Sequence, residues 1–190
     1  NITFPITFSS EVPEKIVFQP LESSAKLNGL QILEQHPTGR KYAHLCRGWK
    51  RFPLFTDATG KILSMPPIIN SHELGKIDAR TTAVFVEATG TDLPTLHQAL
   101  NILVTALADM GGTLYSLKVV YPNQTITTPD LQPQKMNCPL TYVNRVLGVE
   151  LTESQLKKYL ERMGHDYQNK TILVPAYRAD ILHPIDIVED

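Results

Sequence analysis

Cysteine and surplus charge are both scarce in this sequence. Its two cysteines, Cys46 and Cys138, form no CxxC pair, which argues against a disulfide framework or a zinc ribbon. The net charge of −1 excludes a generally basic protein, so any contact with nucleic acid must be local or aided by a partner. No apolar run approaches the length of a membrane span, and no signal peptide opens the chain. We therefore expect a cytoplasmic protein with reduced thiols and no membrane partner.

The composition is that of a globular protein, with 42% hydrophobic and 19% charged residues. A chain of 190 residues can form one large domain or two small ones, and either can bury a core. The sequence has no initiator methionine, begins in a strand-like pattern and stops within an apparent helix. We therefore expect a fragment of a longer polypeptide.

The first two thirds of the chain mix strand and helix patterns. Apolar alternation or β-branched runs predict strands at 1–18, 41–49, 81–90 and 114–121. Turn residues at 57–60 predict a hairpin. The stretch 23–35 fits a helix or a strand. A long helix is predicted after the cap Asp92, and it ends at two glycines.

Four prolines between residues 122 and 139 indicate a domain boundary near Thr128. Beyond it, "LTYVNRVLG" predicts a short helix that Gly148 ends. "LTESQLKKYLERMG" predicts a second helix, because Thr152 and Gln155 stand at capping-box positions. The strand pattern "TILVPAY" and a helix near Pro184 follow.

Three strings occur in an order that resembles one known family: "LSMPPIINS" at 63–71, "FVEATGTD" at 85–92 and "VPAYRADILHPIDIVED" at 174–190. Together they resemble the beta subunit of phenylalanyl-tRNA synthetase of the archaeal and eukaryotic cytosolic type. The resemblance implies a mixed α/β (α+β) editing domain at 1–128 and a small α+β, winged-helix-like module at 129–190. It also implies a parent ligase of two alpha and two beta subunits. ATP and the aminoacylation chemistry belong to the alpha subunit, and the sequence has no GxxxxGK[ST] loop.

The resemblance further implies hydrolysis of mischarged Tyr-tRNA(Phe), with tyrosine as the editing ligand. The stiff "PPIIN" run would form apolar walls, and the Glu87 carboxylate would accept a hydrogen bond from the tyrosine hydroxyl. The candidate pocket residues are Pro67, Asn70, Ser71, Glu87, Thr89, Thr91 and Asp92. Other interpretations stay open: Glu87 on the exposed face of a strand, Asp92 as a helix cap, and Asn70 with Ser71 in a turn.

The sequence departs from bacterial members of the family in one string. They carry a histidine in a "PLHAFD"-like string, where this chain has "PLFTD" at 53–57. No general base is therefore carried over, and the catalytic group is unassigned. A positioned water aided by the terminal ribose hydroxyl is the remaining route, and His44 is a weak substitute, because a lone strand histidine is more often structural.

Two charged clusters complete the candidates. One is basic and either a solvated face or a contact for the acceptor end of tRNA: Arg40, Lys41, Arg47, Lys50 and Arg51. The other is acidic and matches the family's Mg²⁺ ligands, although carboxylates near a helix N-terminus are also stabilising without metal: Asp180, Asp186, Glu189 and Asp190. The competing functional hypothesis is a non-catalytic module that docks tRNA and the alpha subunit.

Overall fold

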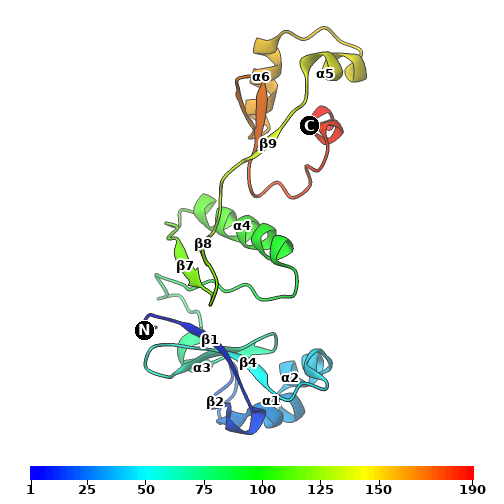
Figure 1. The fold of residues 1–190 in the computed structure, drawn as a ribbon. Coiled ribbons are helices and arrows are strands. Elements are labelled where there is room, and N and C mark those ends of the chain that lie inside the picture. The colour runs from blue at the N-terminus through cyan, green and yellow to red at the C-terminus, as the bar shows by residue number, and fades with distance from the viewer. The chain divides into compact units, whose positions relative to one another are not determined.

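The computed structural model describes residues 1–190, which divide into two compact units, Asn1–Thr89 and Gly90–Asp190 (Figure 1). The fold is mixed α+β with small antiparallel sheets, as predicted. None of its helices has both the length and the hydropathy that a membrane span requires. The boundary predicted near Thr128 falls inside the second compact unit, and the division into an editing domain and a fifth module stays a prediction.

The first unit contains a four-stranded antiparallel sheet in the order β1-β4-β5-β6 and a two-stranded ribbon, β2-β3. The strands are β1 Thr7–Glu11, β2 Val17–Phe18, β3 Leu27–Asn28, β4 Phe52–Thr56, β5 Ile62–Met65 and β6 Ile69–Asn70. The helices are η1 Pro13–Lys15, α1 Gly29–Gln35, α2 Pro37–Tyr42, η2 Ala43–Cys46 and α3 His72–Gly75.

The hairpin between β4 and β5 confirms the turn prediction. Asp57 is buried, and its carboxylate accepts hydrogen bonds from the backbone N–H groups of Thr59 and Lys61 and from the Thr59 hydroxyl. These donors hold the pKa of Asp57 below its usual value. A carboxylate satisfied in this way fixes the turn and the register of the two strands that it joins.

One face of the sheet carries the core of the first unit. Phe52 and Leu54 of β4 and Met65 of β5 are buried with Ile32 of α1 and Ile68. Because side chains alternate along a strand, the residues between them point to the opposite face. The candidate site lies on that opposite face.

Two strand predictions in the first unit are wrong. Residues 41–49 end α2 and form η2, because Pro37 begins a helix at a position where its missing N–H is harmless and the His36 ring accepts from the Thr38 N–H. Residues 81–90 pair with no strand. The ambiguous stretch 23–35 contains α1, which Asn28 and Gln31 start with a capping box.

The second unit contains the long helix α4 Leu93–Asp109 and a hairpin of β7 Leu117–Val120 and β8 Thr125–Thr128. A three-stranded sheet follows in the order β10-β11-β9, with β9 Gln134–Met136, β10 Asp166–Gln168 and β11 Thr171–Val174. Its helices are α5 Leu140–Leu147, α6 Glu153–Arg162 and α7 Pro184–Glu189.

The terminal signals of this unit act as predicted. Gly148 ends α5 in the left-handed conformation, and Thr152 and Gln155 form a capping box at the start of α6. Nine buried side chains from 138–188 form a continuous core, and Ile172 of β11 is fully enclosed in it. On α4 the buried residues are Asn101 and Val104.

Candidate functional site

Four side chains form a row across the face of the four-stranded sheet that lies opposite the core, called the open face below. Phe8 of β1 is the partner of Phe55 of β4, Phe55 is the partner of Ser64 of β5, and Ser64 is the partner of Asn70 of β6. Residues directly opposite each other in antiparallel strands project to the same face. The row therefore runs from aromatic to polar across four strands.

The segment before the unit boundary contributes two more side chains to this face. The ring of Phe85 lies 6.3 Å from that of Phe55, edge to face. Two residues later, the Glu87 carboxylate accepts from the Ser64 hydroxyl, with Oγ at 2.8 Å from Oε1 and 3.0 Å from Oε2. Residues 81–90 thus meet the sheet through side chains rather than through a backbone ladder.

Glu87 is a half-buried carboxylate that forms no ion pair. Burial raises its pKa, and the hydrogen bond from Ser64 opposes that rise. When ionised, a carboxylate is an acceptor with about four lone-pair sites, of which one hydroxyl donor occupies only part. Glu87 therefore keeps the capacity to accept a second hydroxyl.

The string at 63–71 divides between the two faces. Asn70 is exposed beside Ser64, and a Cβ on Gly75 would lie 2.5 Å from the Cβ of Asn70, so that close approach requires glycine. Ser71 is buried and caps α3, its hydroxyl accepting from the Leu74 N–H at 3.2 Å. Pro67 is exposed. Ile68 lies in the core, so the expectation that it forms a pocket wall is wrong.

The remaining pocket candidates flank the unit boundary. Thr89 is exposed at the end of the first unit, whereas Thr91 and Asp92 belong to the second. Asp92 caps α4, as its Oδ2 accepts from the Thr95 N–H at 2.9 Å. Two hollows of the second unit, of about 800 and 320 Å³, are lined by none of the candidate pocket residues.

The basic candidates all have exposed side chains. Arg40 and Lys41 are in the last turn of α2, and Arg47, Lys50 and Arg51 lie between η2 and β4. Arg51 donates to Ser10 of β1 and pairs with Glu11 at 3.4 Å. The other four cations form no ion pair. His44, the weak substitute base, is exposed in η2.

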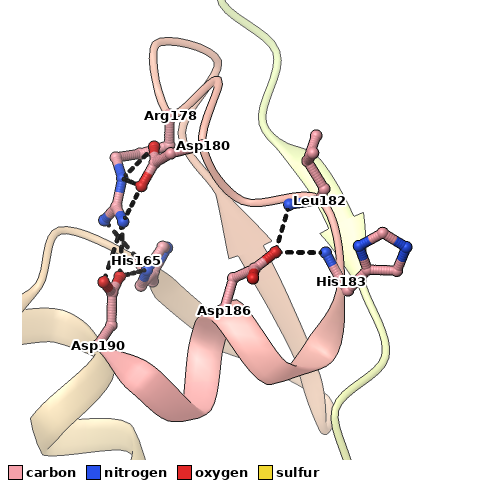
Figure 2. A network of polar contacts seen from close by, with 7 residues as sticks. All are labelled: His165, Arg178, Asp180, Leu182, His183, Asp186 and Asp190. Carbon is pink, nitrogen blue, oxygen red and sulfur yellow. Dashed lines mark hydrogen bonds and ion pairs between the residues drawn. The ribbon is translucent and has the colours of Figure 1, made fainter.

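At the end of the chain an arginine stands between two of the acidic candidates (Figure 2). Arg178 donates to both oxygens of Asp180, with Nε–Oδ1 at 2.9 Å and Nη2–Oδ2 at 2.7 Å. The same Nη2 lies 2.8 Å from Asp190, which also bonds to the buried His165 at 2.9 Å. Arg178 lowers the pKa of Asp180, and Asp180 and Asp190 raise that of Arg178.

The other two acidic candidates face elsewhere. Asp186 accepts from the backbone N–H groups of Leu182 and His183 at 2.8 and 2.7 Å, and these bonds lower its pKa. Glu189 is exposed. No three acidic, histidine or cysteine side chains gather where they could hold a metal ion. As they lie here, the four carboxylates do not fit Mg²⁺, which needs several oxygens around one point.

Sequence reasoning missed two residues of these sites, Ser64 and Arg178. Ser64 is a polar side chain within the apolar run "ILSMPP", which was the available signal for a buried hydroxyl with a partner. Arg178 precedes Asp180 by two residues, and neither residue lies in a helix or a strand. Only the fold reveals that pair.

Residues 136–190 match the family model of the tRNA synthetase B5 domain. The chain is 40% identical over 190 residues to the Phenylalanine--tRNA ligase beta subunit of Thermococcus sibiricus, covering 98% of this chain and 34% of the relative. It is 43% identical over 187 residues to that of Pyrococcus furiosus, covering 96% and 33%. The chain thus spans about a third of these curated relatives.

A solved structure shares the fold. The crystal structure of an N-terminal fragment of the phenylalanyl-tRNA synthetase beta-subunit from Pyrococcus horikoshii superposes with a TM-score of 0.90 and 35% identity. The match covers 99% of this chain and 55% of that one. The similarity therefore extends over both units.

Proposed function

Since the chain belongs to the archaeal-type phenylalanyl-tRNA synthetase beta subunits, as a segment of about a third of their length, we propose that its open sheet face hydrolyses mischarged Tyr-tRNA(Phe). Phenylalanine and tyrosine differ by one hydroxyl. A hydrophobic synthetic site rejects an amino acid that merely adds a hydroxyl by only ~10². A second site that favours the hydroxyl and cleaves the ester raises fidelity.

The contact between Ser64 and Glu87 is the observation that carries this proposal. Ser64 donates to both carboxylate oxygens, at 2.8 and 3.0 Å, and so orients the group on the open face. The aromatic side chains Phe55 and Phe85 stand beside it. An apolar ring site next to an oriented acceptor suits a phenol better than a phenyl ring. A hydrogen bond to a charged group is worth roughly 1.5–3 kcal/mol, which favours tyrosine by ~10- to 150-fold.

No side chain on this face is assigned as the general base. The string "PLFTD" lies in β4 and its turn, and it has no histidine. Cleavage then depends on a water molecule positioned beside the ester and on the terminal ribose hydroxyl of the tRNA. Asn70 lies on the same face as Ser64 and is the candidate to hold the substrate's ester or amino group.

The missing histidine also favours a second candidate function, a non-catalytic module that docks tRNA and the alpha subunit. Under either function the tRNA, the alpha subunit and a cytoplasmic location are proposals carried by the family. Mg²⁺ binding by Asp180, Asp186, Glu189 and Asp190 also stays a prediction. It requires Arg178 to release two carboxylates, so no step of the proposed hydrolysis depends on it.

Deacylation of Tyr-tRNA(Phe) and Phe-tRNA(Phe) by the chain tests the two functions. The parent should cleave the tyrosyl ester faster, and Glu87→Ala should lose that preference by ~10- to 150-fold while remaining folded. Glu73→Ala is the matched control, because Glu73 is an exposed carboxylate of the same unit that pairs with Lys61. A parent that binds tRNA but cleaves neither ester would establish the docking function. Full tyrosine preference in Glu87→Ala would move hydroxyl recognition to another group of the first unit, with Thr89 next in line.

A further inference from the structure

The segment from His36 to Arg51 concentrates positive charge in a chain that is slightly acidic as a whole. It contains five Arg and Lys residues and no Asp or Glu, against a net charge of −1 for the chain. Four of its cations, Arg40, Lys41, Arg47 and Lys50, are exposed and form no ion pair. Such a surface suits a partner with repeated negative charge.

The only tryptophan of the chain, Trp49, stands among these cations. Its side chain is 47% exposed, and its neighbours in sequence include Arg47 and Lys50. Its backbone N–H donates to the carbonyl of Cys46 at 3.1 Å, and the Cys46 side chain is part of the buried core. The indole is therefore presented to solvent from an anchored loop.

We propose that Trp49 and the cations Arg47 and Lys50 bind an unpaired RNA end, with one base stacked on the indole and the flanking phosphates at the cations. Proteins that bind single strands combine a positive surface with aromatic platforms, since every base has a face that stacks. Bases within a double helix are already stacked and present no free face to the indole. A protein partner fits less well, because it would have to desolvate four cations that have no carboxylate here.

This inference rests on the tRNA contact of the proposed function, and it is tested with RNA that carries no amino acid. A short single-stranded RNA should quench the tryptophan fluorescence of the chain, excited selectively, which comes from Trp49 alone. Trp49→Leu should weaken binding by about 5- to 150-fold, which corresponds to stacking of about 1–3 kcal/mol. Trp49→Phe should restore part of the affinity. Lys50→Ala should reduce the salt slope by about 0.7, one phosphate's share for a single strand.

Tyr115→Leu is the matched control, because Tyr115 is an exposed aromatic residue of the second unit, and it should leave binding unchanged. Equal affinity of parent and Trp49→Leu, or equal affinity of the parent for a duplex, would overturn the stacking and leave only phosphate contacts. Quenching by the alpha subunit but not by RNA would assign the surface to a protein partner. If the parent chain cleaves neither ester but RNA still quenches its Trp49 fluorescence, the result would contradict the proposed hydrolysis and support this inference.

Discussion

Removing the Arg178 guanidinium should destabilise the second unit by about 2–4 kcal/mol. Arg178 and Asp190 are each only 17% exposed, and their nitrogen and oxygen atoms lie 2.8 Å apart. A hydrogen bond to a charged group in that setting contributes roughly 1.5–3 kcal/mol. Asp180 is 64% exposed, so its pair with Arg178 adds at most about 1 kcal/mol. Arg178→Met keeps most of the side-chain length and removes both contacts.

Hydrogen exchange of backbone amides measures this effect in each unit separately, which a single melting curve of two units cannot do. The amides of buried Ile172 and Val174 on β11 report on the second unit, and that of Met65 on β5 reports on the first. Arg178→Met should lower the opening free energy at β11 by about 2–4 kcal/mol and leave Met65 unchanged.

Arg162→Met provides the comparison, because Arg162 is an exposed arginine at the end of α6 in the same unit. Its loss should cost less than about 1 kcal/mol, the range for a surface cation near a helix C-terminus. If Arg178→Met were no more destabilising than Arg162→Met, the arginine's contacts with Asp180 and Asp190 would be screened by solvent and the reasoning refuted.

Two further outcomes follow from the charged groups. If Asp180, Asp186, Glu189 and Asp190 bind Mg²⁺, excess Mg²⁺ should raise the opening free energy at β11 in hydrogen exchange, and Asp186→Asn should abolish the rise; an unchanged value would show that Arg178 keeps Asp180 and Asp190 from the ion. Burial raises the pKa of Glu87, so the stability that its protonated form provides is present below its unfolded pKa and is lost as the pH rises through the folded pKa. Glu87→Gln should therefore gain stability over the parent across that window, by at most about 1.4 kcal/mol per pH unit, as measured by hydrogen exchange at Met65 of the first unit; a pH-independent difference would contradict the burial argument.

The helix ends of the second unit could be predicted from local signals. Gly148 adopts the left-handed conformation that ends α5, and Thr152 with Gln155 bonds to the free N–H groups at the start of α6. The hairpin turn at Asp57 was predictable for the same reason, since its bonds are formed within five residues.

Sequence prediction fails where the conformation or the contacts of a segment depend on residues far away in the sequence. Residues 81–90 have high strand propensity, but propensity measures fit to a neighbouring strand, and no strand pairs with them. Residues 37–46 fold as two short helices, too short to display a helical repeat in the sequence. Glu87 could be chosen from the sequence because it is a carboxylate within an apolar, strand-like run. Its hydrogen-bond partner Ser64 lies 23 residues away in the sequence, so no local pattern connects the two. Arg178 was missed because one of its two partners, Asp190, lies 12 residues away in the sequence.

The close approach of Gly75 to Asn70 makes the open sheet face sensitive to a residue that takes no part in it. Because the side chain at position 75 is a single hydrogen, Asn70 can lie against the backbone of α3. Any larger residue there would displace Asn70 from behind while leaving Ser64 and Glu87 in place. Under the proposed hydrolysis, a substitution at this position lowers translational fidelity by moving Asn70, although residue 75 itself does not contact the substrate, and a survey of substitutions confined to the contact residues would miss it.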